Sequence, residues 1–413
     1  MKDNIYFDNA ATTWPKPESV YTFMDAFFRT NGVNPGRGGH AMSTDAEAMT
    51  YATRQMLAAF FGFSGDANRV IFTLNGTDSL NIALNGLLSS GDHMITTRIE
   101  HNAVLRISNH LERDASVDIS RVAVDQDGYV SPHSIAQAIQ PNTKVIVVNH
   151  ASNVIGTVQP LSQIAQIARE YNVKLVVDTA QSAGLLPIDM DKLGIDVLTF
   201  TGHKGLFGPM GIGGLIVSDN TELRPARVGG TGVNSISNFQ PDVYPHKLEA
   251  GTVPLPGIAG LHAAQLWFRA LGKKQQLEAG VHDDTIADKD KHHDLCSVAI
   301  DHIHKTEMTL LFEIESWLNA YPAVQVLGNA RTHERVANLS FVVEGMASEQ
   351  LGAMLDADHH ICVRAGLHCA PLVHVDAGTA DTGGAVRISP GYFTDSEDMH
   401  RLRTGLDDLL RTP

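Results

Sequence analysis

The stretch KLVVDTAQSAGLLPIDMDKLGIDVLTFTGHKG, residues 174–205, decides the fold. It contains two short apolar runs, residues 174–178 and 197–200, whose β-branched residues are typical of buried strands. The first run ends in Asp178, and the second is followed by Thr201-Gly202-His203-Lys204. Ligands of open α/β sheets collect at the carboxyl ends of the strands. We therefore expect these two strand ends to contribute to one functional site.

Runs of the same kind alternate with helical patterns over most of the first 255 residues. The other predicted strands are residues 70–73, 93–96, 117–124, 144–148 and 213–217. Helical patterns lie between several of them, at residues 78–88, which place apolar residues on one face, and at residues 160–171, which open with a proline. Strands that alternate with helices predict an α/β fold with a mainly parallel sheet covered on both sides.

The sequence pattern changes after about residue 255. A hinge rich in Pro and Gly, residues 252–257, precedes long helical stretches. Short strands follow at residues 336–343 and 385–388. We expect a large α/β domain over residues 18–255 and a smaller α+β domain made of residues 1–17 and 256–413.

Charge and composition exclude several classes of protein. The chain of 413 residues carries 31 Lys and Arg against 46 Asp and Glu, a net charge of −15, so it lacks the basic surface of nucleic-acid-binding proteins. Its three cysteines suit a reducing compartment better than a disulfide framework. No apolar run approaches the roughly 18 residues of a membrane span. We expect a cytoplasmic enzyme that binds neither nucleic acid nor a membrane.

A further strand end suits an anion. Residues 70–73 lead through Asn75-Gly76-Thr77-Asp78 into a predicted helix, so free backbone N–H groups and the positive helix end meet at Gly76 and Thr77. A phosphate group would bind there, but an ordinary capped loop explains the same residues. The residues alone leave both interpretations open.

Asp178 and Lys204 indicate what else the site could hold. A carboxylate at the end of an apolar strand is costly unless it has a charged partner, such as a protonated pyridine nitrogen; a helix N-cap is the alternative role. Lys204 lies among glycines at a sheet edge, where an amine can be desolvated and form a Schiff base, although most lysines in turns are simply solvated. Its position one strand after Asp178 favours the catalytic role. The glycines that follow Lys204 lack the spacing of a dinucleotide-binding motif.

These strand ends belong to a series of motifs that runs along nearly the whole chain. The motifs are YFDNAATT at 6–13, NPGRGGH at 34–40, EHN at 100–102, SNVIGT at 152–157, DTAQS at 178–182, TGHK at 201–204, AGT at 250–252 and VRAGLHCAP at 363–371. With them the chain resembles the cysteine desulfurases, in the aminotransferase class V group of fold type I pyridoxal-phosphate enzymes, and it is most similar to the Suf-type branch.

The resemblance implies that pyridoxal 5'-phosphate is the cofactor. Lys204 would form a Schiff base with it and later move the Cα proton of the substrate. Asp178 would pair with the ring nitrogen, Gln181 would hydrogen-bond the phenolic oxygen, and His101 would stack on the ring and assist proton transfer. The phosphate would be held by Gly76, Thr77, Thr201, His203 and, from the other subunit of a homodimer, Thr252.

The resemblance also implies the substrate side of the site. Asn153 and Arg387 would grip the substrate carboxylate, with Asn153 also beside the cofactor, and Arg364 is a further candidate. Cys369 would attack the substrate sulfur and leave an enzyme persulfide and alanine. Because an unperturbed thiol is only a few per cent ionised at neutral pH, Arg364, His368 or the substrate must help to activate it.

The expected function is therefore the conversion of L-cysteine to L-alanine, with the sulfur transferred to Cys369. Selenocysteine lyase and cysteine sulfinate desulfinase would use the same groups. A transaminase or a non-catalytic scaffold for a sulfur carrier is less favoured, because neither needs the full set of reacting groups. A sulfur-acceptor protein and a role in iron–sulfur cluster assembly are expected extras.

Two features depart from the family pattern. The polar segment from residue 277 to Cys296 shows no helical stripe and is expected to be an exposed excursion, longer over residues 280–296 than is usual for the family. Its histidines and Cys296 match no standard zinc spacing, so no metal is predicted. Leu367 stands where the Suf-type branch often has a histidine, which leaves the activation of Cys369 open.

Overall fold

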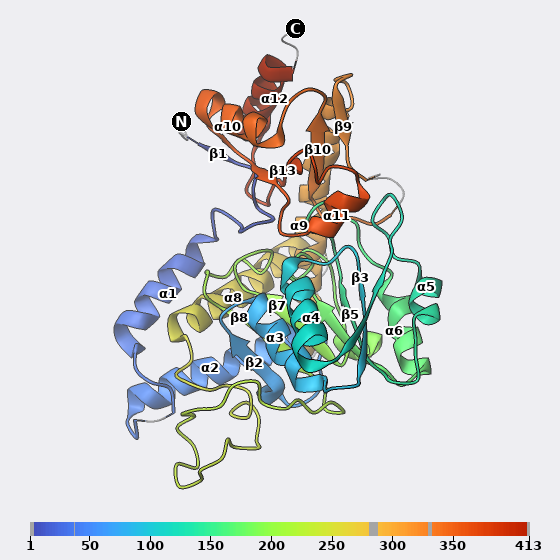
Figure 1. Ribbon diagram of the computed structural model, residues 1–413. Coiled ribbons are helices and arrows are strands. Elements are labelled where there is room, and N and C mark those ends of the chain that lie inside the picture. Colours follow the sequence, from blue (N-terminus) through green and yellow to red (C-terminus); the bar gives the residue numbers. More distant parts are fainter. Residues whose placement is uncertain (1–3, 37, 281–287, 329–332, 411–413) are drawn as a thin grey trace.

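A computed structural model describes residues 4–36, 38–280, 288–328 and 333–410 of the chain (Figure 1). The larger part is built on a seven-stranded sheet. Its strands follow the order β2 (Val70–Thr73), β8 (Gly213–Val217), β7 (Val197–Thr201), β6 (Lys174–Asp178), β5 (Thr143–Asn149), β3 (His93–Thr97) and β4 (Asp118–Val122). All are parallel except β8, which runs antiparallel to both β2 and β7 because it follows β7 without an intervening helix. This confirms the predicted α/β fold with a mainly parallel sheet.

The sheet is buried on both faces because successive strand residues point to opposite sides. In β5, Val145 and Val147 belong to the core on one face of the sheet, which is covered by α3 (Gly76–Leu87) and α4 (Asn102–Ala115). Ile146 and Val148 belong to the core on the other face. The other face is covered by α2 (Ala41–Phe60), α6 (Leu161–Glu170) and α8 (Leu255–Glu278). The remaining helices of this part are α1 (Glu18–Asn31), α5 (Pro132–Gln137) and α7 (Met190–Leu193), with a short 3-10 turn at Ala67–Arg69.

The smaller part holds an antiparallel sheet with its own core. The strand order is β12 (Arg364–Gly366), β13 (Ala385–Ile388), β10 (Leu339–Val343) and β9 (Val324–Val326). The N-terminal strand β1 (Ile5–Tyr6) pairs with β11 (Ile361–Cys362), so the start of the chain joins the C-terminal region in this smaller part. The helices are α10 (Ser348–His359), α11 (Pro371–Asp376), α12 (Ser396–Leu410) and the end of α9 (Asp288–Leu318).

The position of α8 bears on the expected division at residue 256. Leu255, Ile258 and Phe268 belong to the core of the large sheet, as do the α9 residues up to Ile303, whereas Met308 and later α9 residues belong to the smaller core. The domain boundaries stay a prediction, and this packing favours a division inside α9.

The expectation of an exposed excursion up to Cys296 was wrong for its last part. Helix α9 begins at Asp288, and His292 and Cys296 are buried. The sequence pattern did not indicate the start of this helix because residues 288–294 are all polar. The apolar stripe of the helix begins with Cys296, Ala299 and Ile300. Residues 281–287 lie outside the described part of the chain.

The arrangement of the described residues bears on metal ions and on membranes. They contain no group of three or more His, Cys, Asp and Glu side chains arranged to hold a metal ion. None of the described helices combines the length and apolar character needed to cross a membrane.

Candidate active site

A cavity of about 310 Å³ lies at the carboxyl edge of the large sheet, where the smaller part closes over it. The structure brings nearly all of the predicted site residues to its wall. They are Gly76, Thr77, His101, Asn153, Asp178, Gln181, Thr201, His203, Lys204, Arg364, Cys369 and Arg387. Thr252 is exposed and does not line this cavity.

Asp178 is the last residue of β6 and is buried at the floor of the cavity. One of its oxygens accepts a hydrogen bond from the backbone N–H of Ala180 at 2.9 Å. A turn follows it, so the alternative role of helix N-cap is wrong. Burial raises the pKa of Asp178, and the nearby positive charge of Lys204 acts in the opposite direction. A buried carboxylate of this kind needs a cationic partner, which the cavity has room to admit.

Lys204 faces the same cavity, and its amine is unusually easy to deprotonate. Burial lowers its pKa from 10.5 to about 8, and Arg387 and Arg364 add to this effect, whereas Asp178 opposes it. At neutral pH a sizeable minority of the amine is therefore neutral. A neutral amine is the form that attacks a carbonyl carbon.

The backbone on either side of Lys204 is held by the N-terminal segment. The carbonyl oxygen of His203 accepts hydrogen bonds from Thr12 Oγ1 at 2.9 Å, from the N–H of Thr13 at 3.0 Å and from Lys16 Nζ at 2.6 Å. The carbonyl oxygen of Lys204 accepts one from Thr13 Oγ1 at 3.0 Å. Burial lowers the pKa of Lys16 to about 7. These contacts fix the peptide from which the Lys204 side chain extends.

The end of the cavity beside α3 contains unsatisfied polar atoms. Helix α3 begins at Gly76, with Asn75 as its N-cap, so the first N–H groups of the helix border the cavity. Thr201 Oγ1 and His203 Nδ1 are buried and have no hydrogen-bond partner among the described residues. Burial, Lys204 and Lys16 lower the pKa of His203 to about 4, so its ring is neutral at physiological pH. Such groups fit an anion with several acceptor oxygens.

His101 is the N-cap residue of α4 and lies at the cavity wall. Its Nδ1 accepts the backbone N–H of Ala103 at 3.0 Å, which places the proton of the neutral ring on Nε2. Burial, together with the positive charges of Lys204, Arg364, Arg106 and Arg387, lowers the pKa of His101 to about 4. The ring is therefore a neutral, flat group with a defined tautomer.

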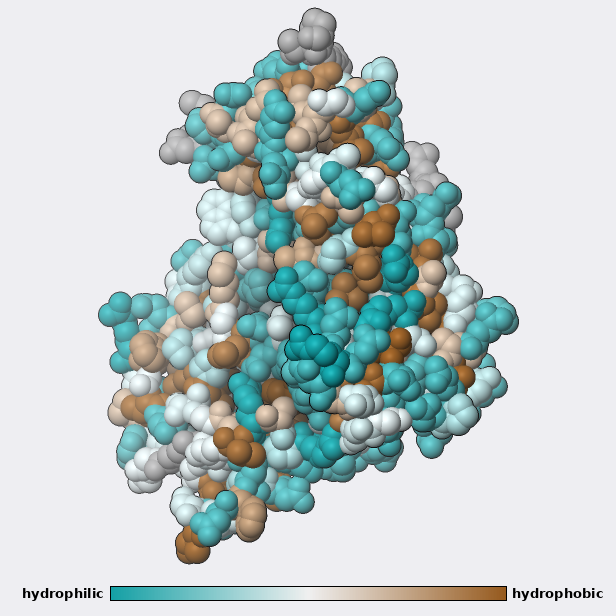
Figure 2. All heavy atoms as spheres, viewed as in Figure 1, coloured by the Kyte–Doolittle hydropathy of each residue, from teal (hydrophilic) through white to brown (hydrophobic). Residues whose placement is uncertain are grey.

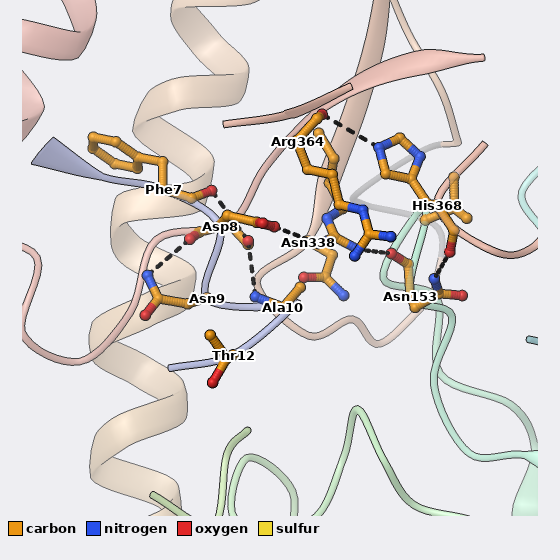
Figure 3. A network of polar contacts seen from close by, with 12 residues as sticks. Phe7, Asp8, Asn9, Ala10, Thr12, Asn153, Asn338, Arg364 and His368 are labelled. Atoms are coloured by element: carbon orange, nitrogen blue, oxygen red, sulfur yellow. Dashed lines mark hydrogen bonds and ion pairs between the residues drawn. The ribbon is translucent and has the colours of Figure 1, made fainter. Parts of the chain in front are cut away.

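Arg387 is the buried guanidinium for which we predicted contact with the substrate carboxylate. Its side chain is buried and donates to the carbonyl oxygen of Asn153 at 2.7 Å and to Asp8 Oδ1 at 2.6 Å. Its Nε has no partner in the described part of the chain. Asn153 in turn donates to the carbonyl oxygen of His368 at 2.6 Å, which connects this region to the loop of Cys369 (Figure 3). A carboxylate that enters the cavity would find Arg387 already oriented.

Gln181 is tied to two residues from distant parts of the chain. Its Nε2 donates to the carbonyl oxygen of Ala10 at 3.0 Å, and its Oε1 accepts from Asn338 Nδ2 at 3.4 Å. The predicted contact with a phenolic oxygen would use the second hydrogen of the same amide.

Cys369 is exposed in the loop between β12 and α11. Arg364 Nη2 lies 3.6 Å from its Sγ, so a positive charge lies next to the sulfur. His368 and Cys369 both have positive φ, at 50° and 58°, a backbone conformation that costs about 1–3 kcal/mol per residue and is common at functional sites. The backbone N–H of Asn102 donates to the carbonyl oxygen of Cys369 at 2.6 Å and helps to hold this conformation.

His368 was one of the candidates for activating Cys369, but its ring is engaged elsewhere. Its Nε2 lies 3.3 Å from the carbonyl oxygen of Arg364, and its Nδ1 lies 3.3 Å from Nε2 of His374. Burial, followed by Arg387, lowers the pKa of His368 to about 3. A buried neutral ring with both nitrogens occupied is poorly placed to take the thiol proton, so Arg364 is the better partner.

Sequence reasoning missed the supporting residues of the site. Asp8, which pairs with Arg387, and Lys16, which holds the His203 carbonyl, received no role, although the motif at 6–13 contains the first and lies beside the second. Ala10 and Ala11 of the same motif line the cavity. The motif itself was the available signal, but nothing in it says which distant residues it touches.

Comparison with known proteins gives one consistent family. The family model for aminotransferase class-V matches residues 5–287 and 292–402. A probable cysteine desulfurase of Methanothermobacter thermautotrophicus is 30% identical, with 99% of this chain and 95% of the relative covered. The apo structure of a cysteine desulfurase from Thermococcus onnurineus NA1 has a TM-score of 0.86 at 27% identity and covers 99% of this chain and 95% of its own. At 24% identity, the structure of the Escherichia coli cysteine desulfurase CsdA, over 99% and 95% of the two chains, shows the same fold with a TM-score of 0.82.

Proposed function

We infer the function from one premise: the chain belongs to the aminotransferase class-V family and, within it, to the cysteine desulfurases. We propose that it converts L-cysteine to L-alanine and keeps the sulfur as a persulfide on Cys369. The observation that carries this proposal is that Lys204 and Cys369, 165 residues apart (369 − 204), line one cavity together with Arg387. The more detailed expectation of a Suf-type enzyme stays a prediction.

Enzymes of this family use pyridoxal 5'-phosphate, and the polar groups of the cavity fit it. The unpartnered Thr201 Oγ1 and His203 Nδ1, with the start of α3 at Gly76 and Thr77, would hold its phosphate. The buried carboxylate of Asp178 would pair with its ring nitrogen. When bound, the cofactor supplies an aldehyde for the Lys204 amine and a ring that stabilises negative charge at the substrate Cα.

Three side chains would orient the cofactor and move protons. Lys204 Nζ, with its pKa lowered to about 8, accepts and returns the Cα proton. The neutral ring of His101 would stack on the cofactor, with the proton on Nε2 because Nδ1 accepts the N–H of Ala103. Gln181 donates the remaining hydrogen of its amide to the phenolic oxygen.

Arg387 and Asn153 would fix the substrate by its carboxylate. Asp8 and the Asn153 carbonyl hold the guanidinium, so little rotational freedom is lost when the substrate binds. With the carboxylate held there, the substrate thiol is free to meet Cys369, which lines the same cavity.

Cys369 would then act as the nucleophile. Its thiolate, beside Arg364, attacks the substrate sulfur; a new S–S bond forms, the substrate C–S bond breaks, and the electron pair returns to the substrate carbon, which is protonated to give alanine. The exposed loop position of Cys369 lets the persulfide leave the cavity afterwards. Selenocysteine would bind in the same way and is the main alternative substrate.

A homodimer is part of the proposal. Segment 228–243 exposes several large apolar side chains at one end of the molecule (Figures 1 and 2). These are Val228, Val233, Ile236, Phe239 and Val243, and Ile236 is 98% exposed. A patch of this kind favours association with a second copy. Thr252 follows this segment and could then reach the phosphate in the partner's cavity.

The test is a single-turnover experiment with the cofactor-loaded protein and L-cysteine. We expect one alanine per site and a mass gain of one sulfur atom on the peptide that contains Cys369. Cys369→Ala should lose the sulfur adduct and Lys204→Ala should lose both products, while Cys362→Ala is the matched control because its thiol belongs to β11, outside the cavity. Undiminished alanine release by Cys369→Ala would overturn the persulfide proposal, and release of keto acid would indicate transamination.

A further inference from the structure

A second hollow lies next to the active-site cavity, between α3 and α4. It has a volume of about 290 Å³, and we call it the α4 groove. Its walls are residues at the beginnings of α3 and α4 together with the loop cysteine. They are Thr77, Asn81, His101, Asn102, Ala103, Arg106, Ile107, His110 and Cys369.

Cys369 lines both the cavity and the α4 groove. The same sulfur can therefore be approached from two sides, one toward Lys204 and Arg387 and the other toward solvent along α4. The surface over α4 is largely hydrophilic in this view (Figure 2). A polar, open hollow of this size suits a small water-soluble ligand and not a lipid.

Arg106 gives the groove its charge. It is exposed and forms no ion pair or side-chain hydrogen bond with any residue that the structure describes. In the described ranges no Asp or Glu lines the groove. Besides Cys369, the other titratable members are His101, which is neutral, and His110, which contacts Asp114 at 2.7 Å. An unpaired guanidinium that lines the same groove as a sulfur nucleophile favours a ligand with a carboxylate.

Resting on the proposed function, we propose that the α4 groove binds the sulfur acceptor, and that this acceptor is a small thiol with a carboxylate group held by Arg106. The substrate carboxylate is assigned to buried Arg387 and the acceptor carboxylate to exposed Arg106, with Cys369 between them. The substrate thiol and the acceptor thiol then bind at different places and need not replace each other in one site. This arrangement allows the enzyme to be emptied of sulfur without opening the cofactor cavity.

The transfer step is balanced without an external oxidant. The acceptor thiolate, which has given its proton to water, attacks the outer sulfur of the Cys369 persulfide. A new S–S bond forms, the bond between Cys369 Sγ and the outer sulfur breaks, and its electron pair stays on Sγ as a thiolate beside Arg364. The acceptor leaves as a persulfide.

The test measures persulfide loss in a separate step. The loaded protein is treated with L-cysteine, rapidly desalted, and mixed with 3-mercaptopropionate, with neutral 2-mercaptoethanol or with cationic cysteamine at low ionic strength, and the persulfide on Cys369 is followed by mass spectrometry. Arg106→Gln should slow discharge by 3-mercaptopropionate about threefold, the size of one exposed ion pair, and leave discharge by 2-mercaptoethanol unchanged. In the native protein, added salt should slow discharge by 3-mercaptopropionate more than discharge by 2-mercaptoethanol, because salt screens the charge of Arg106.

The control variant is Arg113→Gln, on the same helix but outside the groove, which should leave all three rates unchanged. Each rate is expressed per persulfide formed, so a protein that forms no persulfide contradicts the proposed function and not the groove. Equal slowing of the carboxylate and neutral thiols by Arg106→Gln, or no slowing of either, would overturn the groove proposal.

Discussion

Lys16→Met tests how strongly the N-terminal segment controls the position of Lys204, the proposed catalytic lysine. In the native protein Lys16 Nζ donates to the His203 carbonyl oxygen at 2.6 Å and to Thr13 Oγ1 at 2.5 Å. Methionine keeps the length and apolar stem of the side chain but removes both donors. Thr12 Oγ1 and the Thr13 N–H still satisfy the carbonyl, so the substitution leaves no buried acceptor without a partner.

The expected loss follows from this geometry. A hydrogen bond to a charged group contributes about 1.5–3 kcal/mol, and the lower value applies because two other donors remain. If the hydrogen bond from Lys16 to the His203 carbonyl acts by orienting Lys204, a loss of about 1.5 kcal/mol corresponds to a tenfold lower kcat for alanine formation. KM for L-cysteine should change little, because Lys16 does not line the cavity.

The pH dependence of the free energy of unfolding gives a second test of Lys16. Burial lowers the pKa of Lys16 in the folded protein from 10.5 to about 7, so between these pH values the unfolded chain binds more protons than the native protein. The free energy of unfolding should therefore rise with pH between about pH 7 and pH 10.5. Below pH 7 Lys16 is protonated in both states, so it should add no pH dependence there. In Lys16→Met this part of the slope should disappear.

The assay combines steady-state alanine production, cofactor content and thermal unfolding at several pH values. Lys192→Met is the matched control because that lysine is an exposed surface residue. A kcat within twofold of the native value at full cofactor content would refute the claim that Lys16 positions Lys204. An unchanged pH slope of stability would refute the buried, titrating state assigned to Lys16.

Three further predictions concern other contacts. Glu249→Gln leaves buried Arg54 without its two 2.8 Å carboxylate contacts and should cost about 3–5 kcal/mol, measured as a lower denaturation midpoint; an unchanged midpoint would contradict this. Asp8→Asn removes the 2.6 Å ion pair that orients Arg387 and should raise KM for L-cysteine about tenfold with a smaller effect on kcat, which steady-state kinetics would show or refute. Apo protein should capture pyridoxal 5'-phosphate through neutral Lys204, so the rate by stopped-flow absorbance should rise to about pH 8 and then level off; a continued rise up to about pH 10, where an ordinary lysine titrates, would contradict the lowered pKa.

The polar residues at the strand ends could be identified from the sequence because their chemistry is local. A run of β-branched residues followed by Asp178, and another followed by His203 and Lys204, predicts both a buried strand and the edge at which its last residues lie. The role predicted for Cys369 came instead from the family resemblance of the motif at 363–371, since a single cysteine does not indicate a function by its residue type. The beginning of α9 could not be found, because the polar residues before Cys296 conceal the face that packs against the large core.

The sequence by itself determined the fold class and the family, and it predicted which groups would react, since these depend on residue type and on short-range order along the chain. Only the tertiary structure decided which groups support them: Lys16 and Thr12 on the His203 carbonyl, Asp8 on Arg387, and Arg364 in place of His368 beside Cys369. The physical reason is that hydrogen bonds and desolvation depend on distances of a few ångströms between residues far apart in the chain. Such distances are set when the N-terminal segment and the smaller sheet pack over the carboxyl edge of the large sheet, as Figure 1 shows.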